Sequence, residues 1–555
     1  MSFKNFPVFL FLIVLLGAVL RFAYLSQMPP SLNWDEISHG YNAYSILKTG
    51  HDEWGQFLPL ANFRAYGDYP LPLNLYLTIP FIATLGLSDF SIRLPHAILG
   101  TLTIIAVYFL TDALTKNRKI SLLASFLAAI DPWLLFPSRA VFQSNLSVFF
   151  LTAAMAAFFN REKRKWLTSV SFLFLGLTLF SYHSTRIFTP LLFPVLIFIY
   201  RKELWERLKK HKDIFIVSTA IVILFFGSLP VILLNPASRV RSNVVFIVDQ
   251  GAINQIEQSR AASNSPFKKI LYNKVTYFVE KFIGNYFVYF SPNFLFLNGG
   301  TQYQFSVPNE GLLYMVSLPF FYLGIILLIW KSIKNKDYRL VLFWLILAPI
   351  PAAITQDQSA VIRATTMLPI PEILAAIGFY EFTKRVQKYE TLLVVVFAVI
   401  SLFSLERYMN IYAKTYRINY SWSWQYGYEQ VVDYAKINYS KYDQIIVTKA
   451  YGEPHEYFLF FLKYDPAKYI SDPNLIRFHQ SDWYWVDHFD KFWFVNDWQI
   501  PKAGNNFVTE SKYNINCSDQ KCLLITSSSN APKEWKKIDN VKFLDGKTAF
   551  EIYEN

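Results

Sequence analysis

Long apolar runs separated by short basic segments dominate the first 405 residues. A helix needs about 20 mostly apolar residues to cross a bilayer, and runs near this length recur along this part of the chain. The run over 5–25 has no small-residue cleavage site and is interpreted as a retained first span. The runs lie near residues 5–25, 94–114, 120–137, 145–160, 167–183, 187–200, 213–234, 311–330, 339–355, 365–382 and 391–405. We therefore predict a polytopic α-helical membrane protein with about eleven spans.

A further apolar run, 70–87, is assigned by the distribution of basic residues. The basic connectors lie at residues 116–119, 161–165, 201–212, 331–339 and 384–388. If 70–87 does not span, all five lie on the same side as the N-terminus, as the positive-inside tendency requires. Pro70, Pro72 and Pro80 suit a broken, surface-lying element. We place an interfacial or re-entrant helix here, in the first external loop, with the N-terminus cytoplasmic and the C-terminus extracytoplasmic.

Residues 406–555 differ in character from the preceding 405. They are polar and rich in Tyr and Trp, and they contain no run long enough to span a bilayer. A helical pattern over 425–438 precedes four strand-like segments. These segments are 444–448, 491–495, 522–526 and 548–553. The pattern predicts a membrane domain over 1–405 and a soluble extracytoplasmic α/β domain over 406–555. Cys517 and Cys522 fit either a disulfide or two free thiols there.

The composition changes how the net charge is interpreted. The chain is 53% hydrophobic and 17% charged, with a net charge of +13, whereas soluble domains carry about 25% charged residues. In a soluble protein this excess of positive charge would suggest a nucleic-acid partner. Here Lys and Arg cluster in short loops between apolar runs, which indicates membrane topology instead. We expect no nucleic-acid partner and a location in the plasma (inner) membrane.

Two adjacent carboxylates, Asp35 and Glu36, follow the first apolar run. Acidic residues near a span are costly if buried unpaired, so they are either functional or solvated, for instance at a helix start. We take Asp35 as a candidate catalytic base and Glu36 as its neighbour. Acids among aromatic rings are common in carbohydrate sites, although an interfacial aromatic belt gives the same pattern. The candidate substrate-binding residues are Trp34, Tyr41, Asp52, Asp68, Tyr69, Gln143, Asn145 and His183.

Four arginines lie in predicted external loops, which are expected to be poor in positive charge. They are Arg64, Arg139, Arg186 and Arg363. A guanidinium can bind two phosphate oxygens in a bidentate manner, and it stays charged when partly desolvated. We therefore predict that these residues bind the phosphate of a lipid-linked substrate. Snorkelling to lipid headgroups is the alternative. His183 has no second His or Cys at ligand spacing, so we expect no metal–histidine site and no cofactor, and a divalent metal stays open without support from the sequence.

The first external loop resembles that of polyprenyl-phosphate-sugar-dependent glycosyltransferases of the GT-C fold. Members of this group include the dolichyl-phosphate-mannose protein mannosyltransferases and the lipid A aminoarabinose transferases. The matching stretches are Trp34–Glu36, Gly40–Tyr44, Gly67–Pro72, Arg93–Pro95 and Ser291–Phe296. The resemblance covers roughly residues 1–400, and residues 406–555 match no module of the family.

The resemblance implies a mechanism. Asp35 would be the general base that activates an acceptor hydroxyl, which attacks the anomeric carbon of a sugar on a polyprenyl phosphate, with inversion. Glu36 would orient the acceptor or the base, and the arginines would neutralise the departing phosphate. Many relatives have an acid where this chain has Gln143 and Asn145, which argues against a metal there. The implied partners are a polyprenyl-phosphate-linked sugar, membrane lipid, and a protein, lipid or envelope-glycan acceptor.

Two other classes of protein fit parts of the pattern. A transporter or flippase of lipid-linked sugars would also show many spans, arginines and aromatic residues, but transporters usually have paired halves and broken helices at the midplane. A non-catalytic membrane protein that binds glycans through its C-terminal domain is the second alternative.

Overall fold

The computed structural model describes residues 6–234, 245–480 and 483–555, and the chain divides into two compact units. The first unit comprises Met1–Ala23 and His96–Met409, and the second comprises Tyr24–Pro95 and Asn410–Asn555. Residues 24–95 therefore pack with the C-terminal part of the chain. The sequence boundary at residue 405 lies near this division, but it does not separate 24–95 from the apolar helices.

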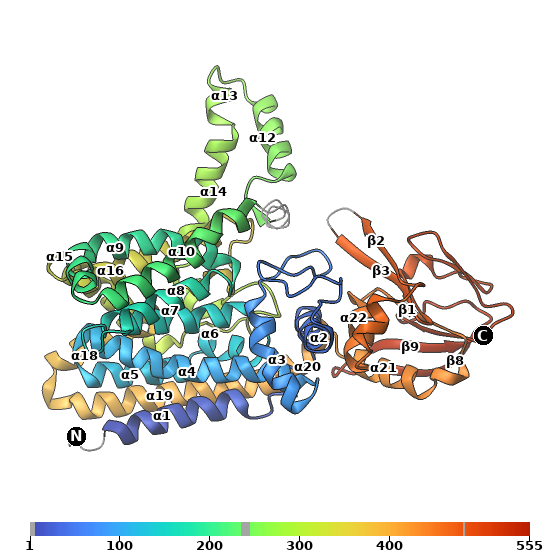
Figure 1. The fold of residues 1–555 in the computed structure, drawn as a ribbon, viewed down its shortest axis with the longest axis horizontal. Helices are drawn as coiled ribbons and strands as arrows, with labels where there is room; N and C mark the ends of the chain where they lie inside the picture. Colours follow the sequence, from blue (N-terminus) through green and yellow to red (C-terminus); the bar gives the residue numbers. More distant parts are fainter. Residues whose placement is uncertain (1–5, 235–244, 481–482) are drawn as a thin grey trace. The chain divides into compact units, whose positions relative to one another are not determined.

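The first unit is a bundle of apolar helices (Figure 1). Its longer helices are α1 (Phe6–Phe22), α4 (Asp89–Thr115), α5 (Arg118–Ile130), α7 (Gln143–Phe159), α8 (Leu167–Thr178), α9 (His183–Lys210), α10 (Lys212–Leu234), α15 (Leu318–Lys334), α16 (Lys336–Leu347), α18 (Ile370–Arg385) and α19 (Glu390–Asn410). Shorter elements are α6 (Pro132–Leu135), η2 (Phe136–Arg139), η3 (Asn293–Asn298), η4 (Met315–Ser317), α17 (Ile350–Ala353), η5 (Arg363–Met367) and η6 (Gln387–Tyr389). Each of the eleven predicted apolar runs contains helix, because local apolar length is a strong signal.

Fewer helices meet a strict criterion for a span. By length and hydropathy, four helical segments of the described residues are long and apolar enough to cross a membrane. They are Asp89–Thr115, Lys212–Leu234, Met315–Lys334 and Gln387–Asn419. A fifth candidate is the pair Arg118–Ile130 and Pro132–Arg139, which is bent by 62°. The chain is an integral membrane protein, and the number of about eleven spans stays a prediction.

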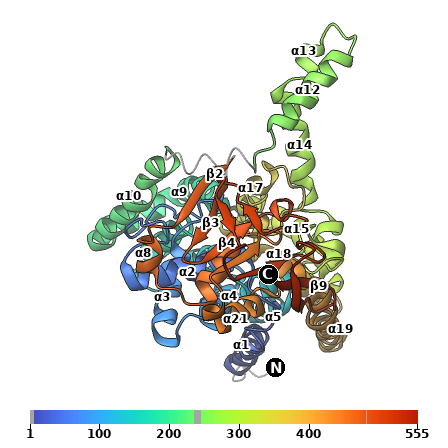
Figure 2. The same cartoon turned by 90° about the vertical axis from the view of Figure 1, so that its right-hand side faces the viewer.

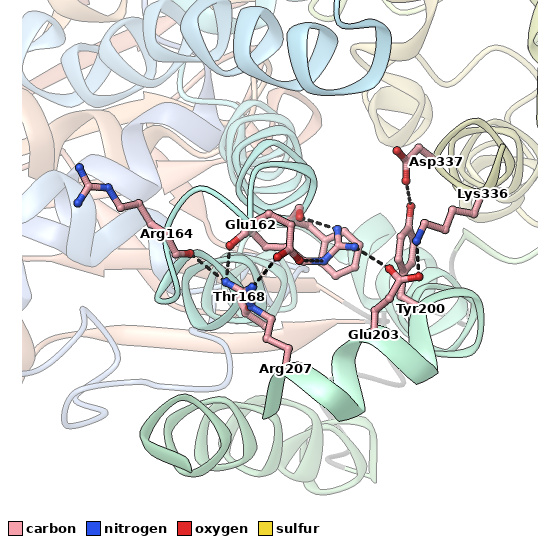
Figure 3. A network of polar contacts seen from close by, with 10 residues as sticks. Glu162, Arg164, Thr168, Tyr200, Glu203, Arg207, Lys336 and Asp337 are labelled. Carbon is pink, nitrogen blue, oxygen red and sulfur yellow. Dashed lines mark hydrogen bonds and ion pairs between the residues drawn. The ribbon is translucent and has the colours of Figure 1, made fainter. Parts of the chain in front are cut away.

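Ion pairs link the connectors at 161–165, 201–212 and 331–339 to one another, and acids that flank 384–388 pair with Lys331 and Lys119. Arg161 Nη2 lies 3.1 Å from Glu203 Oε2, and Lys336 also pairs with Glu203. Arg207 Nη1 lies 3.0 Å from Glu162 (Figure 3). Further pairs link Lys331 to Glu381 at 3.2 Å and Lys119 to Glu390 at 2.6 Å. The connectors therefore share one end of the bundle, as the assignment of 70–87 requires.

A helical hairpin stands out from the bundle of the first unit (Figures 1 and 2). It consists of α12 (Gln250–Ala262), the short α13 (Lys268–Leu271) and α14 (Lys274–Val288). Asp249 caps α12 by accepting from Ala252 N at 2.7 Å, and Asn273 caps α14. The connector between α10 and α15 thus contains helices, and residues 235–244 lie outside the described residues.

The second unit begins with two helices from the predicted first external loop. They are α2 (Trp34–Thr49) and α3 (Leu73–Leu85), which pack against each other. At 1.5 Å per residue, the 13 residues of α3 are about 20 Å long, which is shorter than the roughly 30 Å hydrocarbon core. Because α5 and α8 have only 13 and 12 residues, the length of α3 does not decide whether it spans, and the non-spanning assignment of 70–87 stays a prediction.

The C-terminal residues of the second unit form a mixed sheet. It contains seven strands in the order β2-β3-β4-β1-β7-β9-β8, with β1 parallel to both β4 and β7. The strands are β1 (Gln444–Thr448), β2 (Ile476–Gln480), β3 (Trp483–Phe489), β4 (Phe492–Val495), β7 (Cys522–Thr526), β8 (Lys536–Lys542) and β9 (Thr548–Glu554), and β5 (Asn506–Val508) pairs separately with β6 (Asn514–Asn516). The helices are α20 (Arg417–Asn419), α21 (Tyr428–Ile437), α22 (Pro454–Phe461) and α23 (Pro466–Ile470), with π-helical η7 (Ile411–Tyr416) and 3₁₀ turns η8 (Ser421–Trp424), η9 (Tyr439–Lys441) and η10 (Asp497–Gln499).

The sheet confirms the predicted α/β character of the C-terminal region. The four predicted strands correspond to β1, β4, β7 and β9, and the predicted helix corresponds to α21. Cys517 and Cys522 form a disulfide between β6 and β7, and both residues are fully buried. The sequence left free thiols open as an alternative because a spacing of five residues does not fix the pairing.

Candidate active site

Asp35 lies in the first turn of α2, where a capping box fixes the helix start. Asn33 Oδ1 accepts from Glu36 N at 3.0 Å, and Glu36 Oε2 accepts from Asn33 N at 3.2 Å. This reciprocal pair satisfies two backbone donors that the helix end otherwise leaves open. Asp35 is partly exposed beside it.

Glu36 holds a buried ion pair with Arg93. Arg93 Nε lies 2.8 Å from Glu36 Oε1, Arg93 Nη2 lies 2.9 Å from Glu36 Oε2, and both side chains are 0% exposed. Arg93 also donates to the carbonyl oxygens of Leu25 and Pro29 at 3.0 and 3.1 Å. These bonds fix the chain before α2 and the start of the helix together. Glu36 is therefore placed to position Asp35, and its described bonds go to the protein itself.

Tyr66 is the side chain that contacts the Asp35 carboxylate. Its hydroxyl donates to Asp35 Oδ1, and burial raises the pKa of Tyr66, so the hydroxyl stays protonated. Tyr66 stacks on Trp483 with ring centroids 5.2 Å apart, and Trp483 Nε1 donates to Glu453. A Cβ on Gly67 would lie 2.1 Å from Trp483, so glycine is required for this close approach.

Sequence reasoning missed the supports of Asp35 that come from the far end of the chain. Trp483 and Glu453 lie more than 400 residues after Asp35, in a region without a family resemblance. Tyr66 directly precedes the matching stretch Gly67–Pro72, and this adjacency was the available clue. A further support is His39, whose Nδ1 lies 2.6 Å from the Asp35 carbonyl oxygen. Burial lowers the pKa of His39, which favours a neutral ring.

The other candidate substrate-binding residues within 24–95 are of two kinds, buried and partly exposed. Tyr41 is fully buried and donates to the Tyr464 carbonyl at 3.1 Å, so it packs the interior of the unit. Asp52 is also buried and accepts from Trp54 N and Gln56 N at 3.0 and 2.8 Å. It therefore closes a turn, as the sequence pattern suggested.

Partly exposed aromatic residues gather around Arg64. Its guanidinium lies 5.0 Å from the Trp54 ring centroid and 4.5 Å from that of Tyr484. Tyr69 Oη donates to Tyr484 Oη at 3.5 Å, and Asp68 accepts from Tyr69 N at 2.8 Å. Stacking of this kind is the cation–π arrangement that arginine favours.

Trp34, which begins α2, is also partly exposed. A Cβ on Gly452 would lie 2.4 Å from its ring, so the ring packs directly on the backbone at Gly452. Trp34 thus lies against the C-terminal part of the same unit, beside the partly exposed Asp35.

Arg139 hydrogen-bonds to the C-terminal end of α1. It is 1% exposed and donates to the carbonyls of Leu20 and Ala23, the latter at 2.8 Å. A cation at a helix C-terminus satisfies open carbonyls and complements the helix dipole. On α7, Asn145 Nδ2 donates to the His96 carbonyl at 3.0 Å, and Gln143 is buried at the helix start. The structure thus gives Arg139 and Asn145 protein partners.

Arg186 and Arg363 line one pocket of the first unit, together with His183. Its volume is about 180 Å³, and its walls are mainly apolar, including Phe246 and Ile354. Arg186 Nε donates to the Leu179 carbonyl at 2.9 Å, and Arg363 Nη1 donates to Thr355 Oγ1 at 3.0 Å. Two guanidinium groups in apolar walls suit an anionic headgroup that carries a hydrocarbon chain. Arg139, which was expected to converge with Arg186 and Arg363, is not among the residues that line this pocket, and phosphate binding by these arginines stays a prediction.

The pocket and the basic connectors lie toward opposite ends of α9. Arg186 is in the first turn of α9 and Arg207 is in its last turn, 21 residues later. At 1.5 Å per residue these positions are about 30 Å apart along the helix, close to the thickness of a bilayer hydrocarbon core. The pocket therefore lies near one membrane face if the connectors lie at the other.

Comparison with known proteins identifies the fold. Residues 11–246 match the family model described as dolichyl-phosphate-mannose-protein mannosyltransferase. No curated protein sequence matches the chain. The structure is similar to ArnT from Cupriavidus metallidurans bound to undecaprenyl phosphate, with a TM-score of 0.53 and 10% identity over 100% of this chain and 98% of that chain.

The archaeal oligosaccharyltransferase AglB from Archaeoglobus fulgidus, in complex with an inhibitory peptide and a dolichol-phosphate, is also similar. The TM-score is 0.52, with 14% identity over 83% of this chain and 64% of that chain. The chain thus spans about two thirds of the length of AglB. The chain is thus an integral membrane protein with the GT-C fold, and the mannosyltransferase family model covers its residues 11–246.

Proposed function

We propose that this chain transfers a monosaccharide from a polyprenyl-phosphate donor to an extracytoplasmic acceptor, with inversion at the anomeric carbon. The acceptor is a protein hydroxyl, a lipid or an envelope glycan. The observation that carries the proposal is the partly exposed carboxylate of Asp35, held at a helix start by the buried Glu36–Arg93 pair. A carboxylate fixed in this way can take a proton from a bound hydroxyl group.

In the proposed reaction, Asp35 accepts the proton of the acceptor hydroxyl as its oxygen attacks the anomeric carbon. The bond from that carbon to the phosphate oxygen breaks, and the polyprenyl phosphate leaves with the bonding electron pair. Tyr66 holds the Asp35 carboxylate through its hydroxyl. The ion pair between Glu36 and Arg93 fixes the first turn of α2, which contains Asp35.

Arg186 and Arg363 are proposed to bind the donor phosphate. Their positive charges oppose the negative charge that develops on the leaving group, and the apolar walls of their pocket accept part of the lipid chain. The lipid phosphates in the structures of ArnT and AglB support a donor of this class. The remaining predicted substrate-binding residues, including Asp68, Tyr69 and Gln143, stay predictions.

A reconstitution assay separates transfer from transport. The purified chain is placed in vesicles with a polyprenyl-phosphate sugar labelled on the sugar, together with candidate acceptors. A transferase releases polyprenyl phosphate and forms glycosylated acceptor in equal amounts. Movement of intact labelled lipid across the bilayer without release of polyprenyl phosphate would instead establish a flippase, and binding without either change would establish a glycan-binding protein.

A further inference from the structure

Three metal-ligand side chains meet inside the second unit, apart from the residues assigned to transfer. Glu53 follows α2, whereas His455 and Glu456 lie in the first turn of α22. One ligand atom from each residue lies within 4.8 Å of the others. The three residues are 2%, 3% and 0% exposed, respectively. The cluster thus joins residues about 400 positions apart in the sequence.

Several oxygens of this cluster lack hydrogen-bond donors. Among the described residues, no donor meets the geometric limits of a hydrogen bond to either carboxylate oxygen of Glu456 or to Glu53 Oε2, although the side chains of Ser38 and Glu53 interact with Glu456. Glu53 Oε1, by contrast, accepts from Trp54 Nε1 at 3.0 Å. A buried carboxylate without donors is costly, and a bound cation is a common way in which proteins offset that cost.

The histidine is oriented as in a metal site. His455 Nε2 lies 4.0 Å from Glu456 Oε1, and its Nδ1 lies 3.5 Å from Glu453 Oε2. The other oxygen of Glu453 accepts from Trp483 Nε1. A carboxylate behind a ligating imidazole fixes the ring and its tautomer, which is the usual arrangement around zinc. Glu453 Oε2 lies on the Nδ1 side of the ring, but among the described residues neither of these two atoms makes a hydrogen bond.

The neighbouring cations do not neutralise these acids. Lys449 is paired with Asp487 in a buried ion pair. Arg477 donates to the backbone carbonyl of Glu53 at 2.6 Å and lies 4.2 Å from the Trp54 ring centroid.

We propose that Glu53, His455 and Glu456 bind one divalent transition-metal ion of the zinc class. Ligands 2.0–2.1 Å from a tetrahedral zinc ion lie about 3.4 Å apart, so the ligand atoms need to move together by about 1 Å or less. An imidazole nitrogen with carboxylate oxygens favours zinc-like ions over magnesium or calcium. The ion would fasten the segment after α2 to α22. This inference does not rest on the proposed transferase function.

Zinc itself is the probe for the test. The full-length chain is purified in detergent with a tag that contains no histidine, stripped with a chelator, and titrated with Zn²⁺ against a chromophoric zinc indicator. We expect one tightly bound ion per chain. His455→Ala and Glu456→Gln are expected to weaken binding by at least the roughly 10- to 100-fold that loss of an outer-sphere partner costs. The matched control is His479→Ala, because His479 is exposed on β2 of the same unit.

The thermal midpoint separates metal loss from misfolding. Glu456→Gln removes a buried carboxylate, so in chelator we expect a midpoint at or above that of the wild type. Zinc is expected to raise the midpoint of the wild type and of His479→Ala, but not that of Glu456→Gln. The proposal is overturned if the wild type binds no stoichiometric zinc. It is equally overturned if Glu456→Gln, folded by this measure, binds zinc as tightly as His479→Ala.

Discussion

Replacing Glu36 by glutamine tests the ion pair on which the position of Asp35 depends. The substitution leaves Arg93 charged and fully buried without its anionic partner, since both side chains are 0% exposed. Breaking a buried pair on one side costs about 3–5 kcal/mol. The capping box should survive, because the glutamine oxygen can still accept from Asn33 N. At 1.36 kcal/mol per factor of ten, local opening of α2 should become about 150- to 5,000-fold more frequent.

Hydrogen–deuterium exchange of the α2 amides measures this local opening directly. The matched control is Glu390→Gln, which breaks the ion pair between Glu390 and Lys119. The side chains of these two residues are 33% and 54% exposed, respectively. Because exposed pairs contribute about 0–1 kcal/mol, this control should leave exchange and the thermal midpoint nearly unchanged. The reasoning is refuted if Glu36→Gln exchanges its α2 amides no faster than Glu390→Gln does.

A double substitution distinguishes the pair from general disruption. Arg93→Met alone leaves Glu36 buried without its cation, whereas Glu36→Gln combined with Arg93→Met leaves no buried charge at either position. The double variant should therefore be less destabilised than the sum of the single variants, by 1 kcal/mol or more in order of magnitude. Additive effects would show that the two side chains act independently.

Two further predictions concern the transfer assay. Tyr66→Phe removes the hydrogen bond to Asp35 and should slow transfer by about tenfold with the donor KM unchanged. The reason is that a hydrogen bond to a charged group contributes about 1.5–3 kcal/mol. A transfer rate equal to that of the wild type would contradict the orienting role of Tyr66. Arg186→Ala and Arg363→Ala should each raise the donor KM by about tenfold or more, as expected for the loss of a charge-assisted contact, whereas the exposed Arg385→Ala should not. Equal KM values in all three variants would place the donor phosphate elsewhere.

The helices and strands were predictable because their signals are local. Apolar length along the chain identified the eleven helical runs, and alternation with turn residues identified β1, β4, β7 and β9. The sequence also indicated a helix over 70–87, which is observed as α3, whereas its non-spanning position, inferred from the basic connectors, stays a prediction. The break between α5 and α6 followed from Pro132, although the sequence analysis treated 120–137 as one run.

The partners of the candidate catalytic residues were not predictable in the same way. Glu36 and Arg93 are 57 residues apart, and nothing in either segment alone shows that they pair. The supports from Glu453 and Trp483 depend on how the sheet packs against residues 24–95. Arg139 looked like Arg186 in the sequence because each follows an apolar run, but only tertiary structure shows that its acceptors are α1 carbonyls.

The most direct test of the account is a single-turnover measurement on Asp35→Asn with saturating lipid-linked donor and acceptor. The asparagine keeps the shape of the side chain and an acceptor oxygen for Tyr66, but it cannot take the proton. We expect the transfer step to slow by about 100- to 10,000-fold with donor binding retained, while Asp519→Asn, at an exposed turn, behaves as the wild type. Transfer by Asp35→Asn at the wild-type rate would contradict the assignment of Asp35 as the general base.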